Sequence, residues 1–303
     1  MALSVSIVGA IRGEGEAWTR GAVARALEEA CGSPVKLTSV ARCDVAVVYP
    51  YLFDTLPFGR VRDDVILGLP KRLRLFDDPV EWALRRRGLP KGSQILFVSH
   101  ENLDAPQWWA WKRWILSTQH PRLTFWPHAL DPLGFRFPYW WCYVRWPRLK
   151  NTNSYDRYGR LYELETLLSP LRKPSSRVVR ENRGVLLAQR LTFPRDGLMS
   201  TLQKRWTIDY VSKWQGKKID LLQKYAAAVV TENSVGYGYE TEKLPDAWVA
   251  GCIPIGYVPA PFCSFNAKLF GDETESYTAY EEPLLLEPPD IGSLILYLAK
   301  LSA

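Results

Sequence analysis

The sequence is poor in residues that bind metals or form disulfide frameworks. Its 303 residues include three histidines and five cysteines, and no two cysteines form a CxxC pair. Cysteines that are scattered and odd in number favour reduced thiols in a cytosolic protein over a disulfide framework or a zinc site. No D-x-D sequence occurs either. We therefore expect a cytoplasmic protein that needs no metal and no other bound cofactor.

Long apolar runs are also missing. No window reaches eighteen uninterrupted apolar residues, the length that indicates a membrane-spanning helix. The opening segment is apolar for only about eight residues and has no basic stretch before it, unlike a secretory signal. These absences predict a chain with neither a membrane span nor a signal peptide.

Positive charge and large aromatic residues are, by contrast, abundant. The net charge is +7, which indicates anionic partners such as nucleotide phosphates, nucleic acid or an anionic membrane face. Basic residues gather in one part of the N-terminal half, at Lys71, Arg72, Arg74, Arg85, Arg86 and Arg87. They fit either peripheral contact with the inner membrane, where lipid-linked acceptors are built, or an ordinary solvated face. No nucleic-acid-binding motif accompanies the charge, so we expect no nucleic-acid partner.

The order of apolar runs predicts an α/β protein. In the N-terminal half, strands are expected at residues 3–11, 44–49 and 94–99, and helices at 18–30 and 79–87. Residues 151–182 are rich in polar residues and proline and read as a connection. Strands then follow at residues 185–188, 207–211, 226–231 and 253–258, with helices between them and a last helix at 291–301. This alternation is typical of doubly wound parallel sheets.

The most informative segment is residues 224–257, KYAAAVVTENSVGYGYETEKLPDAWVAGCIPIGY. An apolar strand ends there in polar residues, and α/β sheets bind ligands beyond the carboxyl ends of their strands. The glycines of the next loop permit a close backbone approach. Pro245 lacks an N–H, so it must lie in the first turn of a helix that has Glu242 and Lys243 at its N-terminus. The segment therefore predicts either a nucleotide-diphosphate pocket or a simple turn followed by solvated cap charges.

About thirteen positions of this segment, ENSVGYGYETEKL and then AGCIPI, resemble the donor-binding signature of the α-1,3-fucosyltransferases, glycosyltransferase family 10. Other segments match in the same order. HENLDAP, from His100, is similar to the segment that carries the family's catalytic carboxylate, and FRFPYWW, from Phe135, is similar to the segment before the domain crossover. Arg195, which follows a proline, resembles the arginine that binds the donor phosphate. The resemblance covers roughly residues 90 to 270 and is thin before them.

The resemblance implies a GT-B fold, in which two Rossmann-like domains face each other across a cleft. Residues 1–150 would bind the acceptor, 151–182 would connect the domains, 183–288 would bind the nucleotide sugar, and 289–303 would form a C-terminal helix. The implied reaction is inverting, metal-independent transfer of L-fucose from GDP-fucose to a hydroxyl of an oligosaccharide or lipid-linked glycan. The expected linkage is α-1,3 to a GlcNAc or glucose residue, as part of glycan biosynthesis.

The same resemblance assigns site residues. The donor-binding residues would be Arg195, Glu232, Asn233, Tyr239, Glu242 and Lys243. Glu101 would be catalytic: it follows an apolar strand, and a carboxylate there can accept the proton of an attacking hydroxyl. A surface glutamate at a strand end is the alternative. The acceptor side would include His100, Asn102, Trp108 and Arg136. The tryptophans at 108, 109, 111 and 114 fit a sugar platform or, more readily, the buried face of a helix.

The sequence departs from the family pattern near the expected guanine pocket. Asp209 is followed by YVSKWQGKK instead of a turn with an early glycine. Gly256-Tyr-Val-Pro replaces G-[SP]-P, and Asn266-Ala-Lys-Leu-Phe replaces N-P-x-S-[FY]. A GT-B enzyme that uses another nucleotide sugar is therefore the first alternative. A nucleic-acid-binding protein is the second.

Overall fold

The computed structural model describes most of the chain. The described residues are 2–9, 22–52, 67, 78–147, 149, 162–168, 180–192, 195–232, 234, 236, 238–256, 268–270, 277–279 and 291–301. The donor residue expected at Asn233 lies outside these ranges, as do the basic residues Lys71, Arg72 and Arg74.

The chain folds into two compact units. Unit 1 comprises Met1–Pro138, Pro147–Tyr155 and Asp290–Ala303, and unit 2 comprises Tyr139–Trp146 and Asp156–Pro289. Two elements belong to a different unit from their neighbours in the sequence. Strand β7 (Val144–Arg145) belongs to unit 2 because it pairs with β8 (Tyr162–Glu163). Helix α10 (Ile291–Ala299) belongs to unit 1 because it packs against α2 (Ala24–Cys31).

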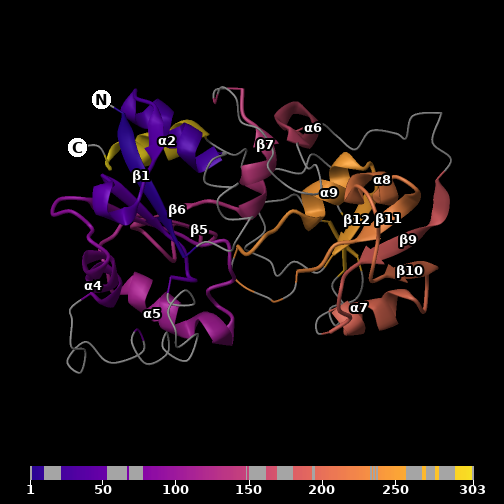
Figure 1. The fold of residues 1–303 in the computed structure, drawn as a ribbon. Helices are drawn as coiled ribbons and strands as arrows, with labels where there is room; N and C mark the ends of the chain where they lie inside the picture. The colour runs from indigo at the N-terminus through magenta and orange to yellow at the C-terminus, as the bar shows by residue number, and fades with distance from the viewer. Residues whose placement is uncertain are drawn as a thin grey trace. The chain divides into compact units, whose positions relative to one another are not determined.

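Unit 1 contains a six-stranded, fully parallel sheet in the order β2-β1-β3-β4-β5-β6 (Figure 1). The strands are β1 (Leu3–Val8), β2 (Val35–Leu37), β3 (Val45–Val48), β4 (Gln94–Val98), β5 (Arg122–Thr124) and β6 (Gly134–Arg136). All four residues of β3 are buried, as expected for a parallel strand covered on both faces. The strand order reverses between β1 and β3, and such a reversal is where α/β sheets bind ligands.

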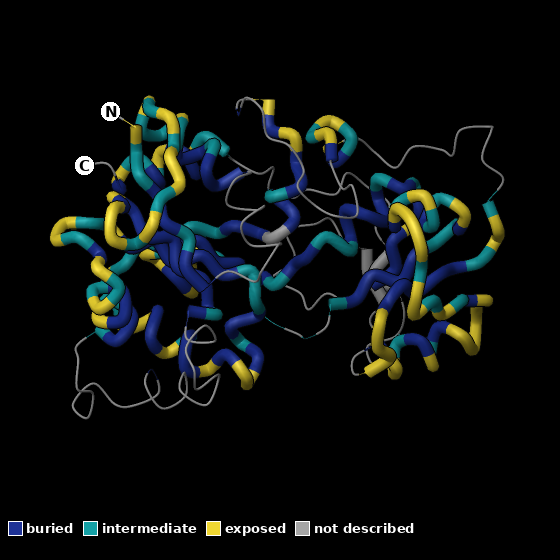
Figure 2. Tube along the Cα trace, in the orientation of Figure 1, coloured by how far each residue is buried: buried dark blue, intermediate teal, exposed yellow. Residues whose placement is uncertain are grey.

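The helices of unit 1 begin and end where local chemistry favours it. They are α2, α4 (Pro79–Arg86), α5 (Trp109–Leu116), α10 and the 3-10 turns η2 (Val40–Arg42) and η4 (Pro106–Trp108). Asp78 caps α4, because its Oδ1 accepts hydrogen bonds from the backbone N–H groups of Val80 and Glu81, both at 3.0 Å. Exposed residues lie mainly on helices and loops, and the central strands are buried (Figure 2).

Three of the four tryptophans in the run lie in the core of unit 1, and Trp109 is exposed. Trp111 and Trp114 are almost fully buried on α5, and their ring centroids are 5.5 Å apart in an edge-to-face pair. Trp111 also stacks on Phe97 of β4, with centroids 5.7 Å apart. Aromatic pairs of this kind contribute about 0.5–1.5 kcal/mol each beyond the area they bury. The core interpretation of these two rings is therefore confirmed.

Unit 2 contains a second six-stranded sheet, in the order β10-β9-β11-β12-β14-β13. Its strands are β9 (Glu181–Leu187), β10 (Ile208–Val211), β11 (Tyr225–Val229), β12 (Ile253–Gly256), β13 (Lys268–Phe270) and β14 (Tyr277–Ala279). The first four are parallel, and β14 pairs antiparallel with both β12 and β13. The order reverses between β9 and β11, which predicts the position of a ligand site in this unit.

Helices cover both faces of this sheet. They are α7 (Arg195–Leu202), α8 (Lys218–Leu222) and α9 (Lys243–Val249), with α6 (Leu164–Leu168) and the 3-10 turn η5 (Tyr139–Tyr143) beside them. Met199 and Leu202 attach α7 to a core that includes Leu186 and Ile208. Figure 1 shows α7 on one side of the sheet and α8 and α9 on the other. Among the described residues, no helix is both long and apolar enough to cross a bilayer.

Candidate functional site

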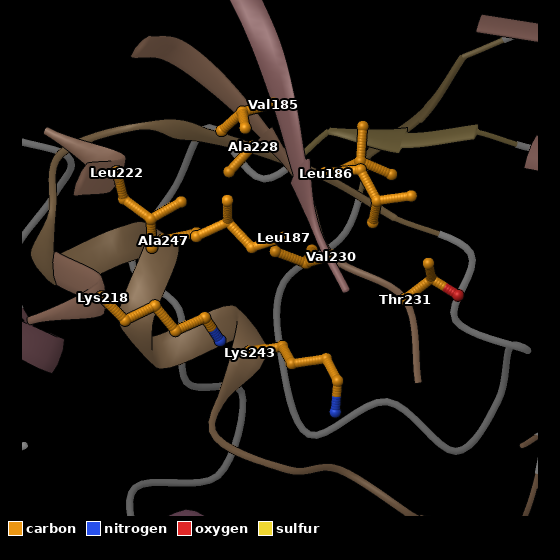
Figure 3. Close-up of a pocket in the computed structure, with 11 residues that line it drawn as sticks. Val185, Leu186, Leu187, Lys218, Leu222, Ala228, Val230, Thr231, Lys243 and Ala247 are labelled. Atoms are coloured by element: carbon orange, nitrogen blue, oxygen red, sulfur yellow. The ribbon is translucent and has the colours of Figure 1, made fainter. Parts of the chain in front are cut away.

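Unit 2 holds a pocket at the point where its strand order reverses. The lining residues are Val185, Leu186, Leu187, Lys218, Leu222, Ala228, Val229, Val230, Thr231, Lys243 and Ala247. They come from the carboxyl halves of β9 and β11, from the residues just after β11, and from α8 and α9. Figure 3 shows aliphatic side chains from the strands on one side of the pocket and Lys218 and Lys243 on the other. The pocket therefore offers an apolar wall and two lysines at a position typical of nucleotide sites.

Glu232 organises the loop that leads into α9. Its carboxylate accepts hydrogen bonds from the backbone N–H of Thr241 at 2.8 Å and from the Thr241 hydroxyl at 2.8 Å. The ammonium of Lys243 lies 2.6 Å from both the Glu232 carboxylate and the Thr241 hydroxyl. Gly238 lies in the intervening loop with φ +70°, as the glycine spacing predicts. The fold thus joins two predicted donor residues, Glu232 and Lys243, through Thr241, whose role the sequence did not indicate.

Arg195 lies among the other predicted donor residues. It is the first residue of α7, and only 7% of its surface is exposed. Burial lowers the pKa of its guanidinium, whereas Glu232, Tyr210, Glu242 and Tyr239 act on it electrostatically in the opposite direction. An arginine with a lowered pKa still carries its full charge at neutral pH. The structure therefore brings Arg195 into the electrostatic environment of three predicted donor residues.

A second buried cluster stands behind α9. Asp246, which is fully buried, accepts a hydrogen bond from the Tyr162 hydroxyl at 2.5 Å and forms an ion pair with Lys218 at 2.9 Å. The Lys218 ammonium also lies 4.0 Å from Oε1 of Glu242. Sequence reasoning missed all three residues. Lys218 begins α8 and Tyr162 lies on β8, so no local motif connects either with α9.

Glu101 lies in unit 1, just beyond β4, as predicted. The hydroxyl of Tyr51 donates a hydrogen bond to its Oε1, and Nε2 of His100 lies 3.5 Å from the same oxygen. The backbone N–H of Glu101 donates to the Ser99 hydroxyl at 3.2 Å. A quarter of the Glu101 side chain is exposed, so the carboxylate is held by neighbours yet accessible. Tyr51 was not predicted from the sequence, because it follows β3, a different strand.

His100 is a neutral neighbour of Glu101 at physiological pH. Burial lowers the pKa of its imidazole, and the negative charge of Glu101 only partly opposes this shift. A lowered pKa in the folded state means that the folded protein takes up this proton less readily than the unfolded chain. The free energy of unfolding is therefore unaffected by His100 above its unfolded pKa of about 6.5. It decreases as the pH falls below that value, because the unfolded chain then binds the proton and the folded protein does not.

The other predicted acceptor-side residues hold structural contacts. Asn102 is buried, and its Oδ1 accepts a hydrogen bond from the backbone N–H of Asp104 at 3.0 Å. Trp108 is 5% exposed, and its ring meets Tyr51 edge to face at 5.2 Å. Arg136 donates from Nη1 to the backbone oxygen of Phe125 at 2.6 Å. Trp108 thus supports Tyr51, which in turn holds Glu101, and its own ring offers no open face for a sugar.

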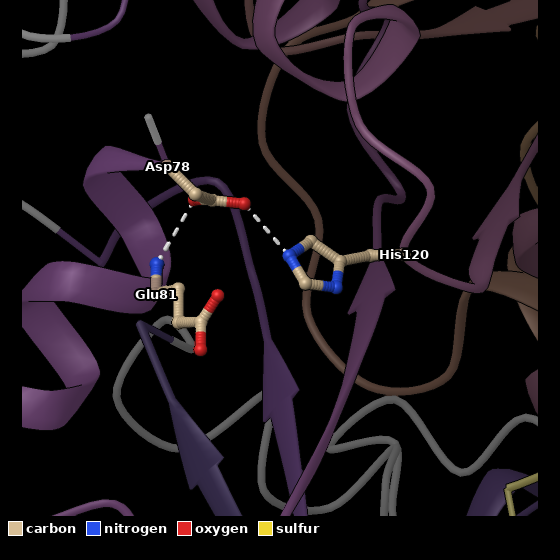
Figure 4. A group of neighbouring side chains, drawn as sticks. All are labelled: Asp78, Glu81 and His120. Carbon is tan, nitrogen blue, oxygen red and sulfur yellow. Dashed lines mark hydrogen bonds and ion pairs between the residues drawn. The ribbon is translucent and has the colours of Figure 1, made fainter. Parts of the chain in front are cut away.

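Among the described residues, one group has three side chains of the metal-ligating type within reach of one another. Ligand atoms of Asp78, Glu81 and His120 lie within 4.8 Å (Figure 4). Asp78 already caps α4, and its carboxylate also interacts with Nε2 of His120 at 2.7 Å. Burial raises the pKa of Asp78, but hydrogen bonds from His120, the Glu81 backbone and Trp114 outweigh it and lower the pKa overall. The group therefore works as an ionised helix cap.

The tertiary structure resembles that of solved glycosyltransferases. Two units, each with a doubly wound α/β sheet, confirm the α/β fold class. The solved structures described in the next paragraph share this fold, which is the GT-B type expected from the sequence. No protein-family model and no curated protein sequence matches the chain.

The particular neighbours are α1,3-fucosyltransferases. One crystal structure of an α1,3-fucosyltransferase aligns with 99% of this chain and 78% of its own, at 15% identity and a TM-score of 0.50. A crystal structure of an α1,3-fucosyltransferase with GDP-fucose aligns with 99% of this chain and 90% of its own, at 12% identity and a TM-score of 0.52. At such identities, the likeness establishes the shared fold and leaves the chemistry to the residues of the site.

Proposed function

We propose that this protein is an inverting fucosyltransferase that moves L-fucose from GDP-fucose to a hydroxyl of a glycan acceptor. The observation that carries the proposal is the contact between Glu232 and Lys243, whose carboxylate and ammonium lie 2.6 Å apart, with Lys243 lining a pocket at the reversal of strand order in unit 2. Arg195 lies within electrostatic range of Glu232 and Glu242. Glu232, Glu242 and Lys243 lie on one segment, and Arg195 comes from a second, distant one. A simple turn with solvated cap charges gives no reason for them to meet.

The donor side would bind the diphosphate through side-chain cations. Helix α9 has only seven residues, so its dipole is short and the charges of Arg195 and Lys243 carry more of the attraction. In transfer, the bond from the fucose anomeric carbon to the diphosphate oxygen breaks and GDP leaves with the bonding electrons. Two cations that neutralise this leaving group would replace the metal ion that other transferases use. Glu232 and Glu242 would accept hydrogen bonds from ribose or sugar hydroxyls.

The acceptor side would be unit 1, with Glu101 as the general base. The acceptor hydroxyl attacks the anomeric carbon as the carbon–phosphate oxygen bond breaks, and its proton passes to the Glu101 carboxylate. A single displacement of this kind inverts the anomeric configuration. The proposed acceptor is an oligosaccharide or lipid-linked glycan. Fucose would be joined through an α-1,3 linkage to a GlcNAc or glucose residue of this acceptor.

The proposed setting is the cytoplasm, at the anionic face of a membrane that presents such acceptors. The net charge of +7 and the exposed Arg86 on α4 support this setting, because basic surface groups are attracted to anionic lipids. Four of the five cysteines, Cys31, Cys43, Cys142 and Cys252, are free thiols, which fits a reducing compartment.

A GT-B enzyme with another nucleotide sugar is the second candidate. The observation that favours it concerns Asp209 on β10. The residues after Asp209 depart from the family pattern, and its carboxylate forms an ion pair with Arg183 at 3.2 Å. A carboxylate engaged in this way is less available to a guanine base.

GDP and GDP-fucose should bind with micromolar affinity, and UDP should bind more weakly. At a hundred times its dissociation constant, GDP should add about 2.7 kcal/mol of apparent stability, visible as a rise in the melting temperature. The measurement is a thermal-shift titration with GDP, UDP and a single-stranded oligonucleotide. Equal stabilisation by UDP would favour the second candidate, and stabilisation by the oligonucleotide alone would favour a nucleic-acid-binding protein. A screen with GDP-fucose on a glycan array would then identify the acceptor.

Transfer activity should persist in EDTA, because the proposed site neutralises the leaving group with Arg195 and Lys243. The check compares initial rates in EDTA, magnesium and manganese. Modest stimulation by a divalent ion through faster product release is compatible with this mechanism. Complete loss in EDTA, restored by manganese, would contradict it.

A further inference from the structure

The strongest observation among residues that the proposed chemistry gives no role is the buried cluster beside α9, whose Lys218 also lines the pocket. Asp246 has no exposed surface, and Lys218 and Tyr162 reach its two carboxylate oxygens from α8 and from β8. Lys218 is itself 7% exposed. Burying a lysine–carboxylate pair has a large desolvation cost, and a hydrophobic replacement of the same volume is often equally stable. Stability alone is therefore a weak reason for these three residues to meet.

The partners of Asp246 also contact Glu242, which the proposed function places at the donor. The Lys218 ammonium is 2.9 Å from Asp246 and 4.0 Å from the Glu242 carboxylate, so one cation faces both acids. The Tyr162 hydroxyl lies 2.5 Å from Asp246 and 3.5 Å from the backbone oxygen of Glu242. The backbone N–H of Asp246 donates to that same oxygen at 2.9 Å. The Lys218 ammonium thus lies at ion-pair distance from the Glu242 side chain, and the Tyr162 hydroxyl lies beside the backbone oxygen of Glu242.

We propose that Tyr162, Lys218 and Asp246 form a positioning network that fixes the Glu242 carboxylate for binding of the nucleotide sugar. The inference rests on the proposed function and adds a second layer of residues to its donor site. Asp246 anchors the Lys218 ammonium, and the anchored cation holds the Glu242 carboxylate in one orientation. Tyr162 fixes the other oxygen of Asp246, so that the carboxylate cannot rotate away from Lys218. Preorganisation of this kind raises affinity because less side-chain freedom is lost when the ligand binds.

The network can be tested with a double-mutant cycle on GDP binding, measured by calorimetry. Tyr162→Phe removes one hydroxyl and keeps the ring, so it should raise the dissociation constant of GDP about two- to tenfold. In a Glu242→Ala background, the same change should leave the dissociation constant unaltered, because the group that the network positions is gone. Equal effects of Tyr162→Phe in both backgrounds, or no effect in either, would overturn the inference.

Lys218 provides an independent arm of the test. Lys218→Met keeps the length of the side chain and removes the charge, and should raise the dissociation constant of GDP about ten- to a hundredfold. Because this change also leaves Asp246 buried without its cation, Lys218→Arg serves as the variant that keeps both charge and fold. Lys218→Arg should restore GDP affinity to within about threefold of wild type, since a guanidinium can contact both carboxylates. Loss of affinity in Lys218→Arg as large as in Lys218→Met would contradict the proposed role.

Tyr297→Phe is the matched control. Tyr297 also has a hydroxyl that bonds to the backbone, accepting from the Arg122 N–H at 2.8 Å and donating to the Leu133 oxygen at 2.7 Å, but it lies in unit 1. Tyr297→Phe should lower the melting temperature and leave the dissociation constant of GDP unchanged. A loss of GDP affinity in this control equal to that in Tyr162→Phe would show a general effect of destabilisation and would overturn the inference. Failure of wild-type protein to bind GDP would overturn both the inference and the proposed function.

Discussion

Glu101→Gln should lower the turnover of fucose transfer by about 10²–10⁴-fold, the usual contribution of a positioned acid–base group. Glutamine keeps the shape of the side chain and can still accept the hydrogen bond from Tyr51, but it cannot take the proton of the acceptor hydroxyl. The dissociation constant of GDP should change little, because Glu101 lies in unit 1 and the donor residues lie in unit 2. The measurement pairs initial rates with calorimetry of GDP binding.

The pH dependence separates a general base from a residue that only maintains structure. The wild-type rate should fall at acid pH, because only an ionised carboxylate can accept the proton of the acceptor hydroxyl, and the Glu101→Gln variant should lose this limb of the profile. Burial keeps His100 neutral at physiological pH, but the folded protein loses stability below about pH 6.5 as the unfolded chain takes up that proton. Thermal denaturation at each pH should therefore accompany the rate measurements.

A matched control for Glu101→Gln is Glu81→Gln in the same unit. Glu81 pairs with Arg85 on α4 at 2.8 Å and lies outside the proposed machinery, so turnover should stay near the wild-type value. Near-normal turnover in Glu101→Gln would remove this residue from the mechanism. The search for the base would then turn to other carboxylates of unit 1. Of these, Asp104 is paired with Lys112 at 2.5 Å and Asp131 is buried against Arg122 at 2.5 Å.

Replacing Arg195 or Lys243 by alanine should weaken GDP binding by about ten- to a hundredfold and slow transfer. Each change removes a cation from the diphosphate, and hydrogen bonds to charged groups contribute about 1.5–3 kcal/mol. The larger loss is expected for Arg195, which is buried, since charge interactions are stronger away from water. The smaller loss is expected for Lys243, because its ammonium must exchange part of its contact with Glu232 for the phosphate.

Lys204→Ala and Arg205→Ala are suitable controls for these variants. Both residues are exposed in unit 2, just after α7. Each control therefore removes one positive charge from unit 2, as Arg195→Ala and Lys243→Ala do. Calorimetry should show wild-type GDP affinity in the controls and reduced affinity in the two site variants. Unchanged affinity in both Arg195→Ala and Lys243→Ala would identify these residues as ordinary cap and surface charges, and the proposed donor site would be wrong.

Most regular elements could be predicted from local sequence patterns. Apolar runs rich in β-branched residues became β1, β3, β4 and β12, and the proline at 245 lies in the first turn of α9. The expected strand at residues 185–188 begins earlier, at Glu181. Its first three residues are charged or polar, so a hydrophobic pattern cannot detect them. Glu181 pairs with Tyr225 of β11, and Arg183 forms ion pairs with Glu181 and Asp209.

The candidate site was predicted in part. Glu232, Glu242 and Lys243 lie on one short segment whose spacing is visible in the sequence, and Arg195 lies within electrostatic range of Glu232 and Glu242. The residues that hold them were not visible. Thr241 joins the segment through contacts to Glu232, whereas Lys218 and Tyr162 enter from separate elements. A motif records residues at fixed spacing along the chain, and these partners have no fixed spacing from α9.

Local sequence patterns were sufficient to predict the α/β class, the order of the elements and the charged segment that precedes α9, because each depends on periodicity, turn chemistry or contiguous residues. Which distant side chains meet depends instead on how the elements pack in three dimensions. A parallel crossover places Tyr51, after β3, against Glu101, after β4. Tyr162 of β8 and Lys218 of α8 meet Asp246 of α9 through packing of these three elements. Tertiary packing also places α10 in unit 1, where the Tyr297 hydroxyl forms hydrogen bonds with the backbone of Arg122 and Leu133. These contacts depend on long-range packing of buried surfaces, and no local preference of the chain specifies them.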